Sequence, residues 1–349
     1  MCRPSRSLWA IPPDPTHAST GTAIRLRSLM EGPEVRIGLL GLGQMGRNHL
    51  RVLSMLRGAN ISFVYDSDGS HARTVAAEHG VRAVDDIEPS LEEVDALIIC
   101  TPTSTHASYV ERFVGRVRAL FVEKPLAHSV EAARRVERIV SESGVLLQVG
   151  FIERFNPAIA ALHRVLQNAE RVISIDFTRT NKLSARITDV DVIMDLMIHD
   201  IDLALYLNGP VEAVSAHGVR RGELIEFASA QLRHANGRFS RLQASRITEK
   251  KMRLVQATCE DRFVECDLLR KEIVIHRQSV LQQSGGSYSI ASQQEAVTIG
   301  LQEALLSELQ AFIQLARGEA TSVVPNIRDG VESLVIADAI AADVLRDGE

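Results

Sequence analysis

Short apolar runs alternate with amphipathic segments through the first half of the chain. Helical spacing of apolar positions, such as Leu50, Leu53 and Leu56, predicts helices, and Ser129 is placed to cap the one that ends near Ser143. Strands that alternate with helices predict a parallel, doubly wound sheet whose carboxyl edge binds ligands. The apolar runs that have the length of buried strands are 35–40, 61–65, 94–100, 119–122 and 145–149.

Beyond Gly150 the pattern changes to β-rich apolar runs with few helices between them. They predict a mostly antiparallel sheet covered by helices on one side. Helices are expected at 157–166, 299–316 and 328–345, and a polar, glycine-containing loop at 284–294. The β-rich runs are 172–180, 211–219, 224–233, 239–247, 252–259, 262–268 and 272–276.

The stretch from Val35 to Asp66 carries a nucleotide-binding pattern. Gly41, Gly43 and Gly46 form G-x-G-x-x-G directly after the first strand, and Asp66 ends the second strand 20 residues beyond Gly46. The glycines allow a tight turn, close approach of the backbone to a pyrophosphate, and packing of helix on strand. Amides at the helix N-terminus hold the phosphates, and Asp66 accepts hydrogen bonds from a ribose. The alternative is a glycine-rich loop that only turns the chain.

This order of features predicts an α/β fold with two domains. A dinucleotide-binding Rossmann domain is expected at 35–150, followed at 151–349 by an α+β domain for substrate binding and oligomerisation. Residues 1–34 contain scattered proline, serine and threonine without an apolar period, so we expect a disordered tail and suspect that translation starts at Met30.

The residues after Asp66 indicate which dinucleotide binds. Ser67 and Asp68 follow it, so two carboxylates and no Arg or Lys lie where the 2′-phosphate of NADP would be. Electrostatic repulsion disfavours that phosphate. We therefore expect the cofactor to be NAD.

Composition excludes several classes of partner. With 24% charged residues, 45% hydrophobic residues and a net charge of −5, the 349-residue chain is typical of soluble globular proteins and has no basic excess for nucleic acid or an anionic membrane. No apolar run reaches the roughly 18 residues of a membrane span. The four cysteines lack C-x-x-C spacing, so we expect neither disulfides nor a metal site and predict a cytoplasmic location.

One apolar stretch, 193–205, carries ionisable residues at helical spacing. Asp195, His199 and Asp202 stand at i, i+4 and i+7, on one face of a helix that is otherwise apolar nearly all round. A buried helix must pair such groups or turn them toward a cavity, because uncompensated interior charge is costly. A histidine held by a structural acid is the simpler interpretation of this helix alone. Lys124, which follows a strand ending beside the predicted cofactor, favours catalysis instead, since alcohol oxidation needs a hydride acceptor, a base and a cation.

These motifs resemble those of the Gfo/Idh/MocA oxidoreductase family. The resemblance runs from Val35 to the C-terminus and rests on the glycine motif, Thr101-Pro102 with His106, Glu123-Lys124-Pro125, Gly150-Phe151 with Phe155-Asn156-Pro157, and Asp195-x-x-x-His199. It implies catalysis on a sugar hydroxyl by Lys124, Asp195 and His199. It implies substrate contacts from Lys124, Asn156, Arg186, Asp195 and His199. Together with the glycine motif, it implies that NAD is bound by Gly41, Gly43, Gln44, Met45, Gly46, Asp66, Thr101, Pro102, His106, Glu123 and Lys124.

Three shorter segments are similar to the UDP-N-acetylglucosamine 3-dehydrogenase subgroup of that family, namely 152–158, 186–190 and 195–202. The similarity implies an NAD-dependent dehydrogenase that oxidises the 3-hydroxyl of a UDP-N-acetylhexosamine. The alternatives are a dehydrogenase of free sugars or inositol, and a non-catalytic NAD-binding regulator, which the presence of Lys124, Asp195 and His199 disfavours. A homo-oligomer, dimer or tetramer, is expected through the uncovered face of the C-terminal sheet.

The catalytic roles follow from intrinsic acidity. Histidine needs the least tuning to accept a proton near neutral pH, so His199 is the expected general base. Asp195, one helical turn earlier, is expected to orient the imidazole, although both side chains could instead contact sugar hydroxyls. Lys124 is expected to donate a hydrogen bond to the reacting oxygen and to stabilise its developing negative charge.

Three basic residues just before this helix have two interpretations. Arg179, Lys182 and Arg186 either border the cleft and hold the diphosphate of a nucleotide sugar, or form a solvated basic surface.

Overall fold

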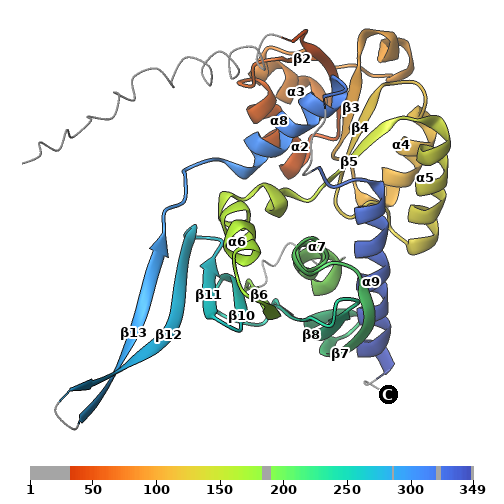
Figure 1. Ribbon diagram of the computed structural model, residues 1–349. Coiled ribbons are helices and arrows are strands. Elements are labelled where there is room, and N and C mark those ends of the chain that lie inside the picture. The colour runs from red at the N-terminus through yellow and green to blue at the C-terminus, as the bar shows by residue number, and fades with distance from the viewer. Residues whose placement is uncertain (1–31, 183–189, 285–286, 320–323, 347–349) are drawn as a thin grey trace, which may run out of the picture.

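The computed structural model describes residues 32–182, 190–284, 287–319 and 324–346, and contains two sheets with helices between and around them (Figure 1). The first sheet is parallel and has the strand order β2-β1-β3-β4-β5. Because the order reverses between β1 and β3, a ligand crevice is expected at their carboxyl ends. The elements of this domain are β1 (Val35–Leu40), α2 (Gln44–Leu53), β2 (Ala59–Tyr65), α3 (Gly69–His79), a 3₁₀ segment (Glu88–Glu93), β3 (Ala96–Ile99), α4 (Thr103–Phe113), β4 (Ala119–Glu123), α5 (Val130–Ser143) and β5 (Leu146–Gly150).

This domain confirms the predicted doubly wound sheet. The strands lie where the apolar runs place them. Strands β1, β3 and β4 are buried over most of their length, because helices cover both faces, whereas the edge strand β2 is only partly buried. Ser129 caps α5 as predicted, with its hydroxyl accepting a hydrogen bond from the amide of Ala132 at 3.2 Å.

The second sheet has eight strands in the order β13-β12-β11-β10-β6-β9-β8-β7. Its neighbours are antiparallel except β6 and β9, which run parallel, so the predicted mostly antiparallel sheet is confirmed. The strands are β6 (Val172–Thr180), β7 (Val211–Arg221), β8 (Leu224–His234), β9 (Phe239–Ser245), β10 (Met252–Cys259), β11 (Arg262–Asp267), β12 (Glu272–Ser284) and β13 (Ser287–Val297).

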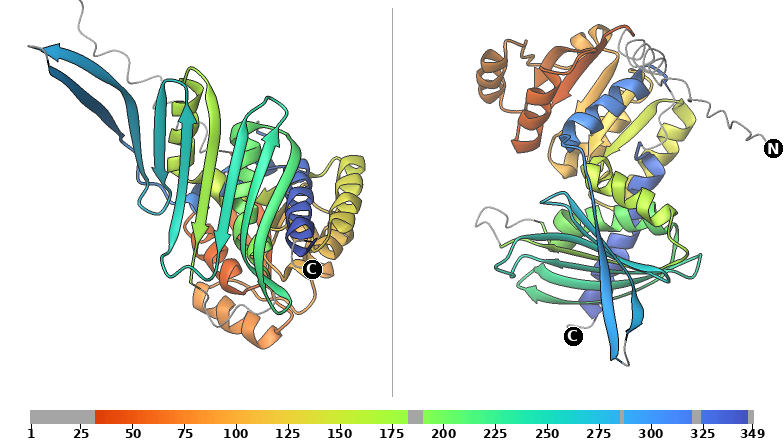
Figure 2. Two further views of the ribbon diagram at one scale, coloured as in Figure 1. Left: turned by 90° about the horizontal axis from the view of Figure 1, so that it is seen from below. Right: turned by 60° about the vertical axis from the view of Figure 1, so that its left-hand side comes forward.

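Helices cover one face of this sheet, and the other face is open in the described part of the chain (Figure 2, left). The covered face packs apolar side chains such as Ile175, Phe177 and Val255 against the helices. The covering elements are a 3₁₀ segment (Ile152–Phe155), α6 (Pro157–Gln167), a π-helical turn (Ile193–Met197), α7 (Ile198–Asn208) and α9 (Ile327–Arg346).

The loop predicted at 284–294 is wrong, because most of it belongs to strand β13. Backbone pairing with β12 holds this strand, for example between Leu281 and Ile290. Its serine and glutamine residues give no apolar alternation, so the sequence pattern alone carries no strand signal there.

The boundary predicted between the domains needs a correction at α8 (Ala304–Ala316). This helix starts later than the predicted residue 299 and packs on the first domain, although it lies within 151–349. Leu309 and Phe312 are fully buried there, and the Phe312 ring meets that of Phe121 edge-on at 5.5 Å between centroids. The chain therefore returns to the Rossmann domain before α9.

Three further predictions concern membrane-spanning helices, disulfide bonds and the N-terminal tail. None of the described helices combines the length and apolar character that crossing a bilayer requires. Cys100, Cys259 and Cys266 carry free thiols. Of the tail predicted at 1–34, residues 1–31 lie outside the described part of the chain.

Candidate active site

A cavity of about 560 Å³ opens where β1, β3 and β4 end. Every predicted cofactor residue except Gly46 lines it. Residues that the sequence analysis missed also line it, and each lies within a few positions of a predicted residue near a strand end, which is the signal that could have found them. The added residues are Tyr65, Ser67, Cys100, Thr103, Thr105 and Tyr109.

The glycine motif fits a bound pyrophosphate. A Cβ on Gly43 would have no atom within 4 Å, so its absence leaves open space above the start of α2. That helix has no side-chain cap and no acidic residue in its first turn, which leaves its amides available to an anion. Gly46 acts differently: a Cβ there would lie 1.9 Å from the carbonyl oxygen of Gly41, so this glycine serves packing and does not line the cavity. Gly41 itself has φ +87°, which favours glycine.

Asp66 lies at the cavity edge with its carboxylate anchored by the backbone. One oxygen accepts the amide of Leu42 at 2.7 Å, and the other accepts that of Asp68 at 3.0 Å. Asp68 caps α3 through the amides of Ser70 and His71, each at 3.0 Å. Asp66 thus brings a carboxylate to the cavity, whereas Asp68 does not line it, and the residues present fit NAD.

His106 and Glu123 line the cavity and also form hydrogen bonds with the backbone of the loops around it. The two ring nitrogens of His106 lie 2.8 Å from the carbonyl oxygens of Pro125 and Thr101, and so join the loops after β3 and β4. Glu123 lies 2.7 Å from His49 Nε2 and accepts the amide of Lys124 at 3.2 Å. Both residues therefore fix the backbone on either side of Lys124.

Lys124 reaches from the end of β4 to the π-helical turn of the second domain. Its Nζ donates to the carbonyl oxygen of Asp195 at 2.8 Å and lies 3.6 Å from Asp195 Oδ1. Burial lowers the pKa of Lys124, while the nearby carboxylates of Asp195 and Glu123 act in the opposite direction. The cation is therefore held between the cofactor cavity and the helix that carries His199.

Asp195 pairs with Arg246, a residue that sequence reasoning missed. The guanidinium Nη2 of Arg246 lies 2.9 Å from Asp195 Oδ2 and also donates to the carbonyl oxygen of Asp191 at 3.3 Å. Arg246 is only 3% exposed. It follows β9 with no motif around it, so only the fold could bring it to this site.

The expectation that Asp195 orients the imidazole of His199 is wrong in this structure. Nδ1 of His199 is buried and has no hydrogen-bond partner among the described residues. The π-helical turn that contains Asp195 departs from the 3.6-residue spacing on which the shared face was predicted, and the Asp195 carboxylate is engaged by the two cations. Burial and the positive charge of Lys124 hold the pKa of His199 well below its usual range.

The third member of the predicted polar stripe, Asp202, is structural. It forms a buried ion pair with Arg154, with Nη2 and Oδ1 2.6 Å apart. Burial raises the pKa of Asp202 to about 6. Helix α7 is enclosed on several sides. Its acidic side chains therefore form ion pairs with different arginines, Asp202 with Arg154 and Asp200 with Arg179, and do not share one cavity.

Asn156 is the one predicted substrate residue outside this cluster that lies in the described part of the chain, and its side chain has other partners. Asn156 is 7% exposed and caps α6, and its amide donates to Glu153 and to the carbonyl oxygen of Leu268. These contacts engage the Asn156 side chain within the protein and argue against a substrate role for it.

The three basic residues at 179–186 do not form one group. Arg179 is buried and pairs with Asp200 at 2.7 Å and Glu153 at 2.8 Å, so it neither holds a diphosphate nor forms a solvated surface. Lys182 lies in an exposed pair with Glu249. Arg186 lies outside the described residues.

Comparison with known proteins agrees with this geometry. Residues 35–151 match the model of an oxidoreductase family with an NAD-binding Rossmann fold, and residues 173–264 match the GFO/IDH/MocA C-terminal domain. UDP-N-acetylglucosamine 3-dehydrogenase of Acidithiobacillus ferrooxidans is 31% identical over 282 residues, which cover 80% of this chain and 88% of that protein. Inositol 2-dehydrogenase of Rhizobium meliloti is 29% identical over 331 residues, 89% of this chain and 97% of that protein.

Solved structures extend the agreement to the whole fold. A structure of the Acidithiobacillus ferrooxidans enzyme superposes with a TM-score of 0.80 at 29% identity, covering 90% of this chain and 98% of that one. A levoglucosan dehydrogenase in complex with NADH shares the fold, with a TM-score of 0.77 at 19% identity, covering 90% of this chain and 98% of that one. On this evidence the protein is an NAD-binding dehydrogenase, and the chain belongs to the GFO/IDH/MocA family of oxidoreductases.

Proposed function

We propose that this dehydrogenase oxidises the 3-hydroxyl of a UDP-N-acetylhexosamine. The observation that carries the proposal is the cluster at the cavity mouth, where Lys124 meets the helix that bears Asp195 and His199. The similarity to the Acidithiobacillus ferrooxidans enzyme supports the choice of a nucleotide sugar.

The proposed mechanism assigns one proton step to this chain. Bound NAD supplies the hydride acceptor. His199 accepts the proton of the sugar hydroxyl. Its lowered pKa keeps the imidazole neutral near pH 7 but also makes it a weaker base, so the step relies on Lys124 to stabilise the oxygen that loses the proton. Lys124 donates a hydrogen bond to the same oxygen and stabilises the charge that develops on it. Asp195 holds the Lys124 ammonium in place, and Arg246 in turn holds the Asp195 carboxylate.

Arg253 is the proposed contact for the diphosphate. Its side chain is 38% exposed, and it pairs at 3.1 Å with Glu153, which also pairs with Arg179, the partner of Asp200 on α7. A guanidinium is suited to phosphate oxygens because its donors are fixed in a plane. Arg186 stays a second candidate on the sequence prediction.

The second candidate substrate is inositol, which the similarity to inositol 2-dehydrogenase favours. A deciding experiment measures NADH formation with NAD and, in parallel, UDP-N-acetylglucosamine, free N-acetylglucosamine and myo-inositol. We expect kcat/KM for the UDP-sugar to exceed that for the free sugar by about 10²-fold or more. Faster turnover of inositol would contradict the nucleotide-sugar assignment.

Two further measurements test which sugar carbon is oxidised and whether Arg253 contacts the diphosphate. A substrate deuterated at C3 should transfer its label to NADH and slow the hydride step. Arg253→Ala should raise KM for the UDP-sugar far more than KM for the free sugar. Arg233→Ala, at an exposed pair with Glu212 on the second sheet, is the matched control and should change neither.

A further inference from the structure

Glu123, the last residue of β4, presents its two carboxylate oxygens to two different partners. Oε2 accepts the backbone amide of Lys124 at 3.2 Å, and Oε1 lies 2.7 Å from Nε2 of His49 on α2. A Cβ on Gly150 would lie 3.0 Å from Oε2, so the neighbouring strand β5 leaves room for this carboxylate because it carries a glycine there. The amide of Lys124 is thus held by one carboxylate, and that carboxylate by one histidine.

His49 is packed into the first domain with one ring nitrogen toward Glu123. The residue is fully buried, and its ring meets that of Phe121 edge-on at 5.1 Å between centroids. The other nitrogen, Nδ1, is enclosed and has no partner among the described residues. Because an ionised carboxylate only accepts hydrogen bonds, the ring N–H belongs on Nε2 and is donated to Glu123.

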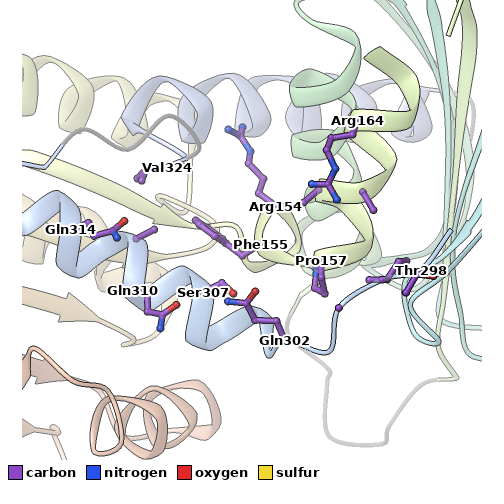
Figure 3. A pocket seen from close by; sticks show the side chains of 15 residues that line it. Arg154, Phe155, Pro157, Arg164, Thr298, Gln302, Ser307, Gln310, Gln314 and Val324 are labelled. Carbon is purple, nitrogen blue, oxygen red and sulfur yellow. The ribbon is translucent and has the colours of Figure 1, made fainter. Parts of the chain in front are cut away.

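A second carboxyl, that of Glu308 on α8, is fully buried and has no donor of its own. Neither of its oxygens has a hydrogen-bond partner among the described residues. Gln310 and Gln314 of the same helix line a separate pocket of about 610 Å³ (Figure 3), and Glu308 lines neither that pocket nor the cofactor cavity. Burial and the charge of Glu123 raise the pKa of Glu308 well above its usual range, so this carboxyl is neutral near pH 7.

The donor from His49 is what distinguishes these two buried carboxyls. An unpaired carboxylate in the protein interior is costly and takes up a proton, as Glu308 does. Glu123 can keep its negative charge because His49 donates to it. The Cys100 thiol adds no further charge, since burial and the charges of Glu123 and Glu308 raise its pKa well above the usual range.

The charge of Glu123 also acts on the Lys124 ammonium. Burial lowers the pKa of Lys124, the charges of Asp195 and Glu123 raise it, and that of Arg179 lowers it. Asp195 has its own partner in Arg246. Glu123 is therefore the one of these two carboxylates whose charge depends on the buried histidine.

We infer that His49 is a positioning residue for Lys124: its Nε2–H holds the Glu123 carboxylate, which holds the amide of Lys124 and serves as a counter-charge to its ammonium. His49 does not line the cofactor cavity, so it acts through Glu123. The inference rests on the role of Lys124 in the proposed function, and it is the same for every candidate sugar or inositol.

The first test compares pH profiles of kcat/KM, measured with the candidate substrate that the wild type turns over fastest. His49→Leu removes the donor, so the alkaline limb should move to lower pH by about one unit, because Lys124 loses a counter-charge. His49→Gln keeps an amide N–H within reach of Glu123 and should return the limb to its wild-type position. The control His234→Leu removes an equally buried histidine from β8 and should leave the limb unchanged. An unmoved limb in His49→Leu, or equal shifts in the Leu and Gln variants, would overturn the inference.

The second test removes the same charge without changing His49. Glu123→Gln keeps the size of the side chain, so it should shift the alkaline limb as His49→Leu does, and the double variant should shift it no further. Additive shifts would show that His49 acts by another route and would overturn the inference. Circular dichroism reports whether each variant is folded.

Lys124→Met separates this inference from the proposed function. Normal turnover of that variant would overturn the role of Lys124 and, with it, the role of His49. An inactive Lys124→Met together with an unmoved alkaline limb in His49→Leu would overturn the role of His49 alone.

Discussion

At the scale of single residues, burial sets the protonation states that the proposed reaction needs. The pKa of His199 is held well below 6.5 by desolvation and neighbouring positive charge, so the imidazole is neutral near pH 7. The pKa of Lys124 is lowered from 10.5 by burial, but adjacent carboxylates oppose this change. A neutral base on α7 and a cation at the cofactor cavity can therefore act on the same oxygen in the proposed reaction.

A bell-shaped pH profile of kcat/KM is the first expected consequence. Activity requires neutral His199, so it should fall on the acid side only well below pH 6.5, as the imidazole gains a proton. It also requires charged Lys124, so it should fall on the alkaline side below pH 10.5, as the ammonium loses its proton. Steady-state kinetics across this range check both limbs.

Substitution of the base tests the same assignment independently. His199→Asn should lower kcat by about 10²–10⁴ and remove the acid limb, with NAD affinity nearly unchanged. His163→Asn is the control, because this histidine on α6 contacts Tyr206 and Gln167 away from the site. Near-normal turnover of the His199 variant would transfer the role of base to Lys124.

Cofactor choice depends on Asp66. Asp66→Ala removes the carboxylate beside the ribose, so it should weaken NAD binding and narrow the difference between NAD and NADP. Titration of cofactor fluorescence with wild type and variant measures both affinities. If wild type binds NADP more tightly than NAD, the electrostatic argument from Asp66 and Asp68 fails.

At the scale of elements, the helix that bears His199 is held by buried ion pairs. Asp202 of α7 pairs with Arg154 of the preceding 3₁₀ segment, and Asp200 pairs with Arg179 of β6. These pairs join α7 to a strand of the second sheet and to the 3₁₀ segment that directly follows the first domain. Removing one partner is costly, because it leaves the other charge buried and uncompensated.

Arg154→Met should therefore lower the free energy of unfolding by about 3–5 kcal/mol. Arg241→Met removes an exposed pair with Asp176 and should cost about 0–1 kcal/mol. Urea denaturation of both variants measures the difference. The double variant Arg154→Met with Asp202→Leu should recover much of the loss, and equal stability of the two single variants would contradict the argument.

At the scale of the whole molecule, the C-terminal part of the chain stabilises the N-terminal domain. α8 completes the core against α2, β4 and β5, and α9 runs between α5 of the first domain and α7 and β7 of the second (Figure 1). The two domains are therefore joined by packing as well as by the chain between them.

Phe312→Ala should consequently weaken NAD binding, although Phe312 is far from the cofactor domain in the sequence, because α8 completes the core of that domain. The ring is fully buried against Phe121, so its loss should cost about 3–5 kcal/mol of stability. Phe239→Ala, at a ring that is 38% exposed on β9, should cost much less. Thermal unfolding with and without NAD compares the variants, and an unchanged midpoint for Phe312→Ala would show that α8 is dispensable.

The sequence predicted the cofactor domain closely because its signals are local. A strand, a glycine motif and a terminal Asp66 must occur in that order for a short βαβ unit to hold a pyrophosphate. Lys124 and His199 were predicted by adding a helix pattern and a resemblance to that frame. The contact predicted between Asp195 and His199 from their i, i+4 spacing is wrong, because a π-helical turn at 193–197 changes the number of residues per turn.

The sequence by itself determined the α/β class and the two kinds of sheet, because local periodicity and backbone requirements record these, and the motifs in it pointed to residues that line the cavity at the strand ends. Only the tertiary structure decided the partners of each charge: Arg246 for Asp195, Arg154 for Asp202, and Asp200 with Glu153 for Arg179. It also decided that α8 returns to the first domain and that 287–297 is a strand. Each of these depends on contacts between residues far apart along the chain, and burial then selects the partner that compensates the charge or covers the apolar face.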